Sequence, residues 1–161
     1  MIRLIKIYIL FLLILVFAGC GFKPIYKTTE GSPNPETYAI TFLNDPGYLI
    51  KNKVTELYKN SPSQSLYNIH INTNQDSIPL VTNTDGTVSK YRIEVSFAFD
   101  VTESDSKNKI YTDISRGFAE YLVQTSEIET DEKRKQAIEI ATQDAIQMMS
   151  IKIQSNIRQS Q

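Results

Sequence analysis

The chain has 161 residues, and its 17 basic and 18 acidic side chains give a formal net charge of −1. This balance gives no argument for a protein that binds a polyanion such as nucleic acid over its whole surface, although it allows a local basic patch. One cysteine and one histidine exclude a disulfide within the chain, a cysteine metal site and any pair of catalytic histidines.

Residues 1–19 have the layout of a secretory signal peptide. A short basic leader with Arg3 and Lys6 precedes an uninterrupted apolar run over residues 7–17. As a helix, this run is only about 16 Å long, roughly half of a hydrocarbon core. We therefore expect the segment to be removed on export. The remaining 142 residues carry a net charge of −3 and suffice for one domain.

The three residues at the cleavage site, Ala18-Gly19-Cys20, resemble a bacterial lipobox, although Phe17 stands where leucine is usual. The resemblance implies an S-diacylglycerol thioether on Cys20 and an N-acyl group, typically palmitate, on its freed amine. Three acyl chains hold a protein to a bilayer essentially permanently, whereas one gives marginal binding. Gly21 in place of an acidic residue implies release to the outer membrane. The alternative is a free cysteine that ends an ordinary signal peptide or an uncleaved anchor.

Residues 20–36 form the predicted lipidated N-terminus and tether, because two prolines and a glycine interrupt the polar stretch at residues 27–36, which has little to bury. A domain is predicted over residues 37–161. Its first strand is expected at residues 37–43, where polar and apolar side chains alternate. Asp45 is predicted to cap a helix that starts at Pro46. The apolar face expected for this helix consists of Ile50, Val54, Leu57 and Tyr58.

The alternation returns at residues 66–71 and predicts a second strand, with the lone His70 on its solvent side. We expect a turn at residues 72–75. Residues 78–83 then pair weakly as an edge segment, because Pro79 cannot donate a hydrogen bond to a neighbouring strand.

The clearest strand covers residues 91–101, where every second residue is apolar. Another strand is predicted at residues 109–123, and we expect it to form a long hairpin with the strand at residues 91–101. Its expected inner residues are Ile110, Ile114 and Phe118, and Gly117 is a candidate β-bulge.

A long final helix is predicted from Thr130 as its N-cap, with about 27 residues that lack glycine and proline. Met148 and Met149 are interpreted as core filling. The apolar stripe of this helix consists of Ile138, Ala141, Ala145, Met149, Ile153 and Ile157.

These elements predict an α+β two-layer sandwich, in which one short and one long C-terminal helix pack on a mostly antiparallel sheet of about four strands. The first strand and the strand after the short helix are expected to be joined by a right-handed crossover if they are parallel neighbours.

The whole chain resembles the lipopolysaccharide-assembly lipoprotein family LptE in its alphaproteobacterial form. The lipobox continues as Cys-Gly-Phe-Lys-Pro-Ile-Tyr at residues 20–26. Further likeness lies in the helix start at 47–57, the Ser-Lys-Tyr-Arg-Ile sequence at 89–93, and Tyr-Leu-Val at 121–123 before a helix rich in alanine and isoleucine.

The resemblance implies a non-catalytic lipoprotein anchored at the periplasmic face of the outer membrane. Its implied partners are the outer-membrane barrel LptD, which it would plug and help to assemble, and lipopolysaccharide. Among the family's basic lipopolysaccharide contacts, only Lys90 finds a match, with Arg92 nearby. A cation there can meet a lipid A phosphate, although a solvated lysine at a strand start is the alternative. No nucleic acid, no metal and no cofactor are implied, apart from the lipid on Cys20.

Three other interpretations remain open. The first is an auxiliary lipoprotein of a phospholipid transport system, because similar two-layer lipoproteins exist. The second is a tethered enzyme that uses Asp113 and Glu120 as a carboxylate pair, although solvated strand positions explain both residues. The third concerns the basic cluster at residues 133–135, which is an exposed helix face or a local anion site.

Overall fold

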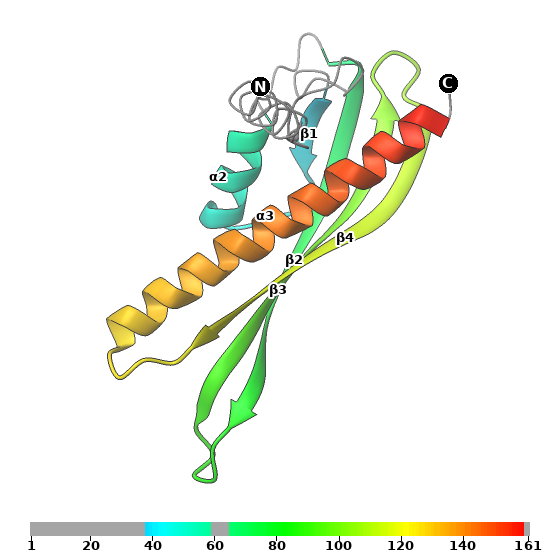
Figure 1. Cartoon of the computed structure of the whole chain (residues 1–161). Helices are drawn as coiled ribbons and strands as arrows, with labels where there is room; N and C mark the ends of the chain where they lie inside the picture. Colours follow the sequence, from blue (N-terminus) through cyan, green and yellow to red (C-terminus); the bar gives the residue numbers. More distant parts are fainter. Residues whose placement is uncertain (1–37, 59–64, 160–161) are drawn as a thin grey trace, which may run out of the picture. The chain divides into compact units, whose positions relative to one another are not determined.

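The computed structural model describes residues 38–58 and 65–159, with side chains as far as Ile157. The signal peptide, Cys20 and the tether lie outside the described residues, so what we expect of them remains a prediction. Figure 1 shows the described elements, which in chain order are β1 (Tyr38–Phe42), α2 (Tyr48–Leu57), β2 (Tyr67–Thr82), β3 (Val88–Glu103), β4 (Lys109–Leu122) and α3 (Glu127–Gln159).

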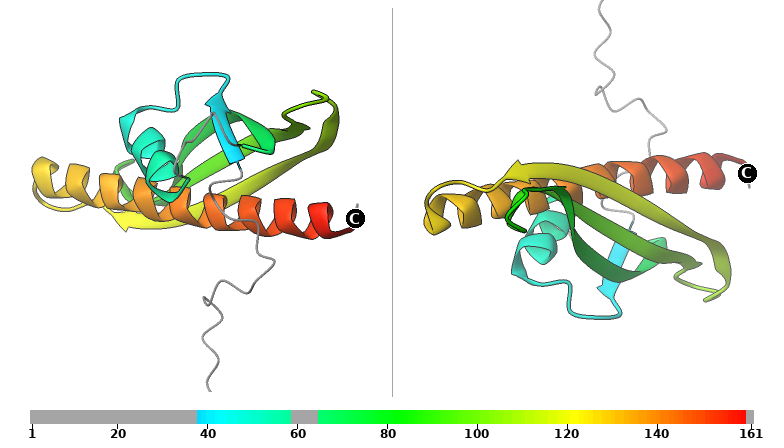
Figure 2. Two further views of the ribbon diagram at one scale, coloured as in Figure 1. Left: turned by 90° about the horizontal axis from the view of Figure 1, so that it is seen from above. Right: turned by 90° about the horizontal axis from the view of Figure 1, so that it is seen from below.

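The four strands form one sheet in the order β1-β2-β3-β4. β1 runs parallel to β2, whereas β2 with β3 and β3 with β4 are antiparallel. Both helices lie on the same side of this sheet, as the views from above and below make clear (Figure 2). The predicted two-layer α+β sandwich is therefore confirmed. The strands before and after the short helix are parallel neighbours, the case that the sequence left open.

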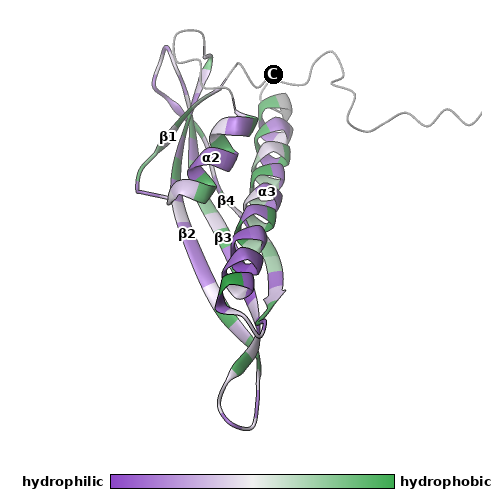
Figure 3. Ribbon diagram, turned by 90° about the vertical axis from the view of Figure 1, so that its left-hand side faces the viewer, coloured by the Kyte–Doolittle hydropathy of each residue, from purple (hydrophilic) through white to green (hydrophobic). Residues whose placement is uncertain are grey.

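The core lies between α3, α2 and one face of the sheet, and β3 runs through its middle. Five alternate residues of β3 are at most 1% exposed: Ile93, Val95, Phe97, Phe99 and Val101. The predicted apolar stripe of α3 is buried against them, and α2 adds Ile50 and Val54. In Figure 3, apolar and polar segments alternate along α3 and the strands, as expected for elements with one covered side.

The predicted inner face of β4 is wrong by one residue. Ile110, Ile114 and Phe118 are 38–46% exposed, whereas Ser115 and Gly117 are buried. The hairpin register explains this outcome, because it places Ser115 opposite Phe97 and Gly117 opposite Val95, on the core side of β3. Since side chains alternate along a strand, the even-numbered residues of β4 must face away from the core.

Gly117 is not a bulge, because the β3–β4 register continues through it without a shift. Instead it permits close contact between β4 and α3. A Cβ atom at this position would lie 2.0 Å from the carbonyl oxygen of Ala141 and 2.5 Å from the backbone nitrogen of Ala145. Small residues on both elements therefore set how closely the helix approaches the sheet.

β2 is longer than predicted. No turn occurs at residues 72–75, because these residues pair with residues 95–98 of β3 and continue the strand. The long partner strand imposes extended structure on a polar sequence. β1 covers only residues 67–71 of β2, so Pro79 lies at an edge, as predicted, beside a register irregularity.

Both predicted helix starts need correction. α2 begins at Tyr48 after Gly47, whose φ of 76° favours glycine, and Asp45 accepts a hydrogen bond from the Gly47 amide instead of capping the helix. α3 begins at Glu127. Thr130 therefore lies within its first turn, where its hydroxyl donates to the Ser126 carbonyl at 3.0 Å.

The inner face predicted for the short helix also needs correction at one position. Leu57 is 42% exposed, while Tyr58, just past the end of α2, is buried and hydrogen-bonds Ser150 of α3. Tyr58 was predicted for the same face and is confirmed there, so only Leu57 departs from the prediction.

Candidate interaction surface

The face of the sheet turned away from α2 and α3 is the candidate site, and we call it the open face. On β3 it carries Lys90, Arg92, Glu94, Ser96, Ala98 and Asp100, and on β4 it carries Ile110, Thr112, Ile114, Arg116, Phe118, Glu120 and Leu122. An antiparallel sheet usually keeps one such face in water. Here that face combines large apolar side chains with ordered ion pairs.

The two predicted lipopolysaccharide contacts lie together on the open face, where both bind one carboxylate. Lys90 Nζ lies 2.5 Å from Glu120 Oε2, and Arg92 donates to Glu120 Oε1 at 2.8 Å. The hydrogen bonds from Lys90 and then Arg92 lower the pKa of Glu120 below its ordinary value. The cluster therefore resembles a cationic site that already holds an internal anion.

Further ion pairs neutralise the rest of the open face. Arg116 lies 3.3 Å from Glu94, and Lys109 Nζ lies 2.7 Å from Asp100. Hydrogen bonds from Lys109 and Thr112 lower the pKa of Asp100. Charges of both signs are thus matched within this face, which reduces the cost of covering it with a second surface.

The apolar side chains of the open face form a row along β4, and we call this row the β4 stripe: Ile110, Ile114, Phe118 and Leu122, with exposures of 38%, 43%, 46% and 56%. A shallow depression of about 560 Å³ beside it is lined by Arg92, Phe118, Ala119 and Glu120. The row combines apolar contact area with a nearby charged cluster, as interfaces commonly do.

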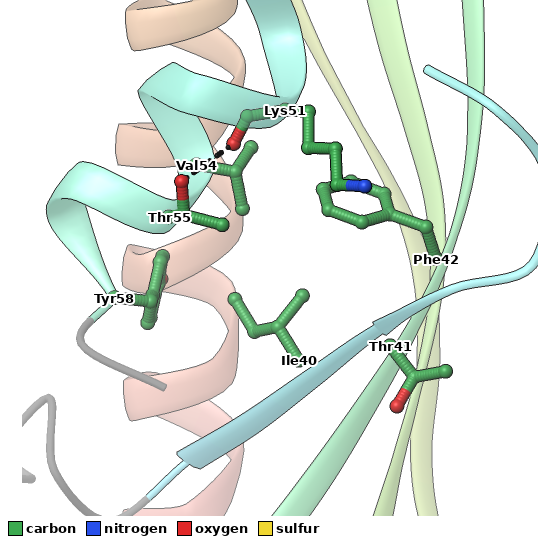
Figure 4. A pocket seen from close by; sticks show the side chains of 7 residues that line it. All are labelled: Ile40, Thr41, Phe42, Lys51, Val54, Thr55 and Tyr58. Carbon is green, nitrogen blue, oxygen red and sulfur yellow. Dashed lines mark hydrogen bonds between the residues drawn. The ribbon is translucent and has the colours of Figure 1, made fainter. Parts of the chain in front are cut away.

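A second hollow lies between β1 and α2, on the helix side of the sheet, and has a volume of about 330 Å³ (Figure 4). Buried or half-buried apolar groups form most of its wall, and Lys51 lies at its side. This volume is at the small end of the range for ligand pockets. The lining residues are Ile40, Thr41, Phe42, Lys51, Val54, Thr55 and Tyr58.

The remaining predicted sites do not join the open-face cluster. Asp113 and Glu120 lie on opposite faces of β4 and form separate ion pairs, with Lys152 and with the Lys90–Arg92 cluster. In the basic run 133–135, Arg134 and Lys135 both pair with Asp131 on the same helix. His70 is half-buried opposite Asp100.

Sequence reasoning missed the role of Glu120 as the shared partner of Lys90 and Arg92. The signal was present in the predicted hairpin, since the register that pairs the two long strands places Arg92 directly opposite Glu120. Opposite charges that face each other across antiparallel strands stabilise the pair.

Within residues 38–58 and 65–159, no group of three or more histidine, cysteine, aspartate or glutamate residues is arranged to hold a metal ion. None of the helices in this part of the chain combines the length and apolar composition needed to cross a membrane.

The described fold is similar to solved structures of lipoproteins. A candidate lipoprotein from Caulobacter crescentus CB15 aligns with a TM-score of 0.65 at 10% identity, over 83% of this chain and 98% of that one. Rare lipoprotein B from Shewanella oneidensis aligns with a TM-score of 0.56 at 9% identity, over 77% of this chain and 98% of that one. A minor lipoprotein from Acinetobacter baumannii aligns with a TM-score of 0.54 at 12% identity, over 76% of this chain and 93% of that one. No protein-family model and no curated protein sequence matches the chain.

Proposed function

We propose that this protein is an outer-membrane lipoprotein of the LptE type, which plugs and helps to assemble an LptD-type barrel that inserts lipopolysaccharide. The observation that carries the proposal is the fold, which the chain shares over most of its length with lipoproteins that include rare lipoprotein B. The lipobox at Cys20 supports the same interpretation, because it supplies the anchor that such a protein needs.

The open face suits a docking surface inside a barrel. The lumen of a wide barrel is polar and must be filled by something other than the barrel's own side chains. Paired charges on β3 and β4 meet such a wall at low electrostatic cost, and the β4 stripe adds apolar area that water otherwise covers. We therefore assign the open face, with Phe118 of the β4 stripe, to contact with the barrel.

Lipopolysaccharide contact, in this proposal, is an exchange of anions. Lys90 and Arg92 both bind Glu120, so a phosphate of lipid A must displace that carboxylate to reach them. Arginine binds phosphate in a two-pronged manner, and a phosphate carries more charge than a carboxylate. Replacing Glu120 by glutamine should then strengthen binding of lipopolysaccharide to the purified protein, while Lys90→Ala should weaken it.

Depletion of the protein from its native Gram-negative host tests the proposal. We expect the barrel to accumulate in a misassembled form and surface lipopolysaccharide to fall. Normal barrel assembly after depletion would contradict the proposed function. A phospholipid bound stoichiometrically to purified protein would instead favour the phospholipid-transport alternative.

The anchor is tested separately by Cys20→Ser, for which we expect a folded domain with weak membrane retention. Mass spectrometry of the mature native protein should find acyl chains on Cys20. Unchanged outer-membrane residence of the variant, or a bare cysteine in the native protein, would remove the lipid anchor from the account.

A further inference from the structure

β4 is the last strand of the sheet, so among the described residues one of its edges has no strand beside it. In an antiparallel strand, the backbone groups of alternate residues point toward the neighbouring strand and away from it. Both backbone groups of Ile114 bind side chains and not β3, which shows that they point to the free edge. By the alternation, the neighbouring even-numbered residues of β4 point their N–H and C=O groups to the same edge. Exposed edges of this kind are templates for pairing with another chain.

Both edge groups of Ile114 are already occupied. The Ile114 N–H donates to Asp113 Oδ1 at 2.7 Å, and Lys152 Nζ donates to the Ile114 carbonyl oxygen at 2.7 Å. Lys152 Nζ also lies 2.9 Å from Asp113 Oδ2, which accepts a second hydrogen bond from the Tyr111 hydroxyl at 2.6 Å. Another strand therefore cannot pair with Ile114 at the free edge of β4 unless these bonds break.

We propose that Asp113 and Lys152 form an edge clamp, which blocks antiparallel pairing of β4 with the β4 strand of a second copy of this chain. The clamp draws one member from β4 itself and one from α3, so it depends on the helix being docked on the sheet. This inference is independent of the proposed function, because it concerns only groups of the described domain.

A second copy is the occupant that the edge fits, because pairing about Ile114 is self-complementary. A two-fold axis at Ile114 would let each Ile114 exchange both backbone hydrogen bonds with its mate and would place Thr112 opposite Arg116. The β4 stripes of the two copies would then join on one continuous open face.

The helix side offers apolar contact as well. Met148 lies one helical turn before Lys152, on the same side of α3, and is 49% exposed. In the paired arrangement, Met148 flanks the junction between the two sheets. Apolar side chains thus flank the free edge on the open face and on the helix side, while the charged side chains of Asp113 and Lys152 cover the backbone groups of Ile114 between them.

The test measures the mass of the purified full-length protein in detergent by sedimentation at matched detergent density. We expect the native protein to be monomeric, and Lys152→Met and Asp113→Asn each to double the protein mass at the same concentration. Lys133→Met is the matched control, because Lys133 lies on the same helix and bonds Gln136 instead of the edge. It should remain monomeric.

A second substitution checks that the new contact is strand pairing. Proline at position 114 removes the amide that pairing requires and is tolerated where that amide points away from the sheet. Lys152→Met combined with Ile114→Pro should therefore return to the monomer. Clamp variants that are folded yet monomeric would overturn the proposal.

Hydrogen exchange on the native protein gives an independent outcome that does not depend on any variant folding. The Ile114 amide should exchange at least tenfold more slowly than the edge amides of Arg116 and Phe118, because Asp113 holds it. Equal exchange at the three positions would show that the clamp does not form in solution, and the proposal would fail.

Discussion

The two faces of one sheet have opposite properties. On the face covered by α3 and α2, β3 buries five large apolar residues almost completely, while the same strand turns Lys90, Arg92 and Glu94 to the open face. Because side chains alternate between the two faces of a strand, residues that stabilise the core alternate with residues that are available for interaction. Substitutions one residue apart should therefore affect different properties.

A large loss of stability is expected at the contact between sheet and helix. Gly117→Ala would push a methyl group against the backbone of α3, so we expect a loss of about 3 kcal/mol in the free energy of unfolding. Urea unfolding, monitored by circular dichroism, measures this loss of stability. Ala98→Val, on the open face of β3, is the control and should change stability by less than about 0.5 kcal/mol. Equal effects of the two substitutions would contradict the assignment of faces.

Phenylalanine truncation on each face gives the next contrast. Phe97 is 0% exposed and Phe118 is 46% exposed. Phe97→Ala should lower the free energy of unfolding by about 3–5 kcal/mol, the usual range for a buried aromatic residue. Phe118→Ala should cost under about 1 kcal/mol, since much of its surface is already in water. A greater loss at Phe118 would mean that the open face is part of the core.

A smaller effect is expected from the clamp carboxylate. The hydrogen bond from Tyr111, followed by that from Lys152, lowers the pKa of Asp113 to about 2. Because the folded pKa lies below the unfolded one, the stabilisation is present above about pH 4 and is lost as the pH falls through about 2. The stability difference between the native protein and Asp113→Asn should therefore shrink over that interval. A difference that stays constant with pH would contradict the ion pair.

The smallest stability effect is expected at the cationic cluster. Glu120→Gln removes an exposed carboxylate, and surface ion pairs are worth about 0–1 kcal/mol. Stability should stay nearly unchanged, while binding of lipopolysaccharide vesicles to the purified protein should rise because Lys90 and Arg92 lose their internal partner. Weaker binding by this variant would show that Glu120 orients the two cations for the ligand.

Much of the fold follows from the sequence because the periods of β3 and α3 are unambiguous. β3 has one apolar side only, and α3 has one continuous apolar stripe beside scattered exposed residues such as Ile140 and Ile151, so the inner faces of both were predicted correctly. β4 has apolar residues on both sides, and Phe118 with the aliphatic residues Ile110, Ile114 and Leu122 lies outside. The hairpin register and the close approach of α3 together make Ser115 and Gly117 the inner residues, and both are tertiary properties.

The candidate site was predictable in part for a related reason. Lys90 was identified because it matches a basic position of the LptE family, and Arg92 because it lies nearby, but their pairing with Glu120 needs the hairpin register. The edge clamp needs still more, because Lys152 reaches β4 only after α3 has docked. Side-chain contacts between elements distant in the sequence require the assembled fold.

The most direct test of the central claim is affinity capture from native membranes with three tagged forms of the full-length protein. These are the native chain, Phe118→Asp on the open face, and Ile140→Asp on the exposed side of α3 as a control. We predict that a large outer-membrane barrel copurifies with the native chain and with Ile140→Asp, and that its recovery falls at least tenfold with Phe118→Asp. Absence of a barrel from the native sample, or equal recovery with all three forms, would contradict the account.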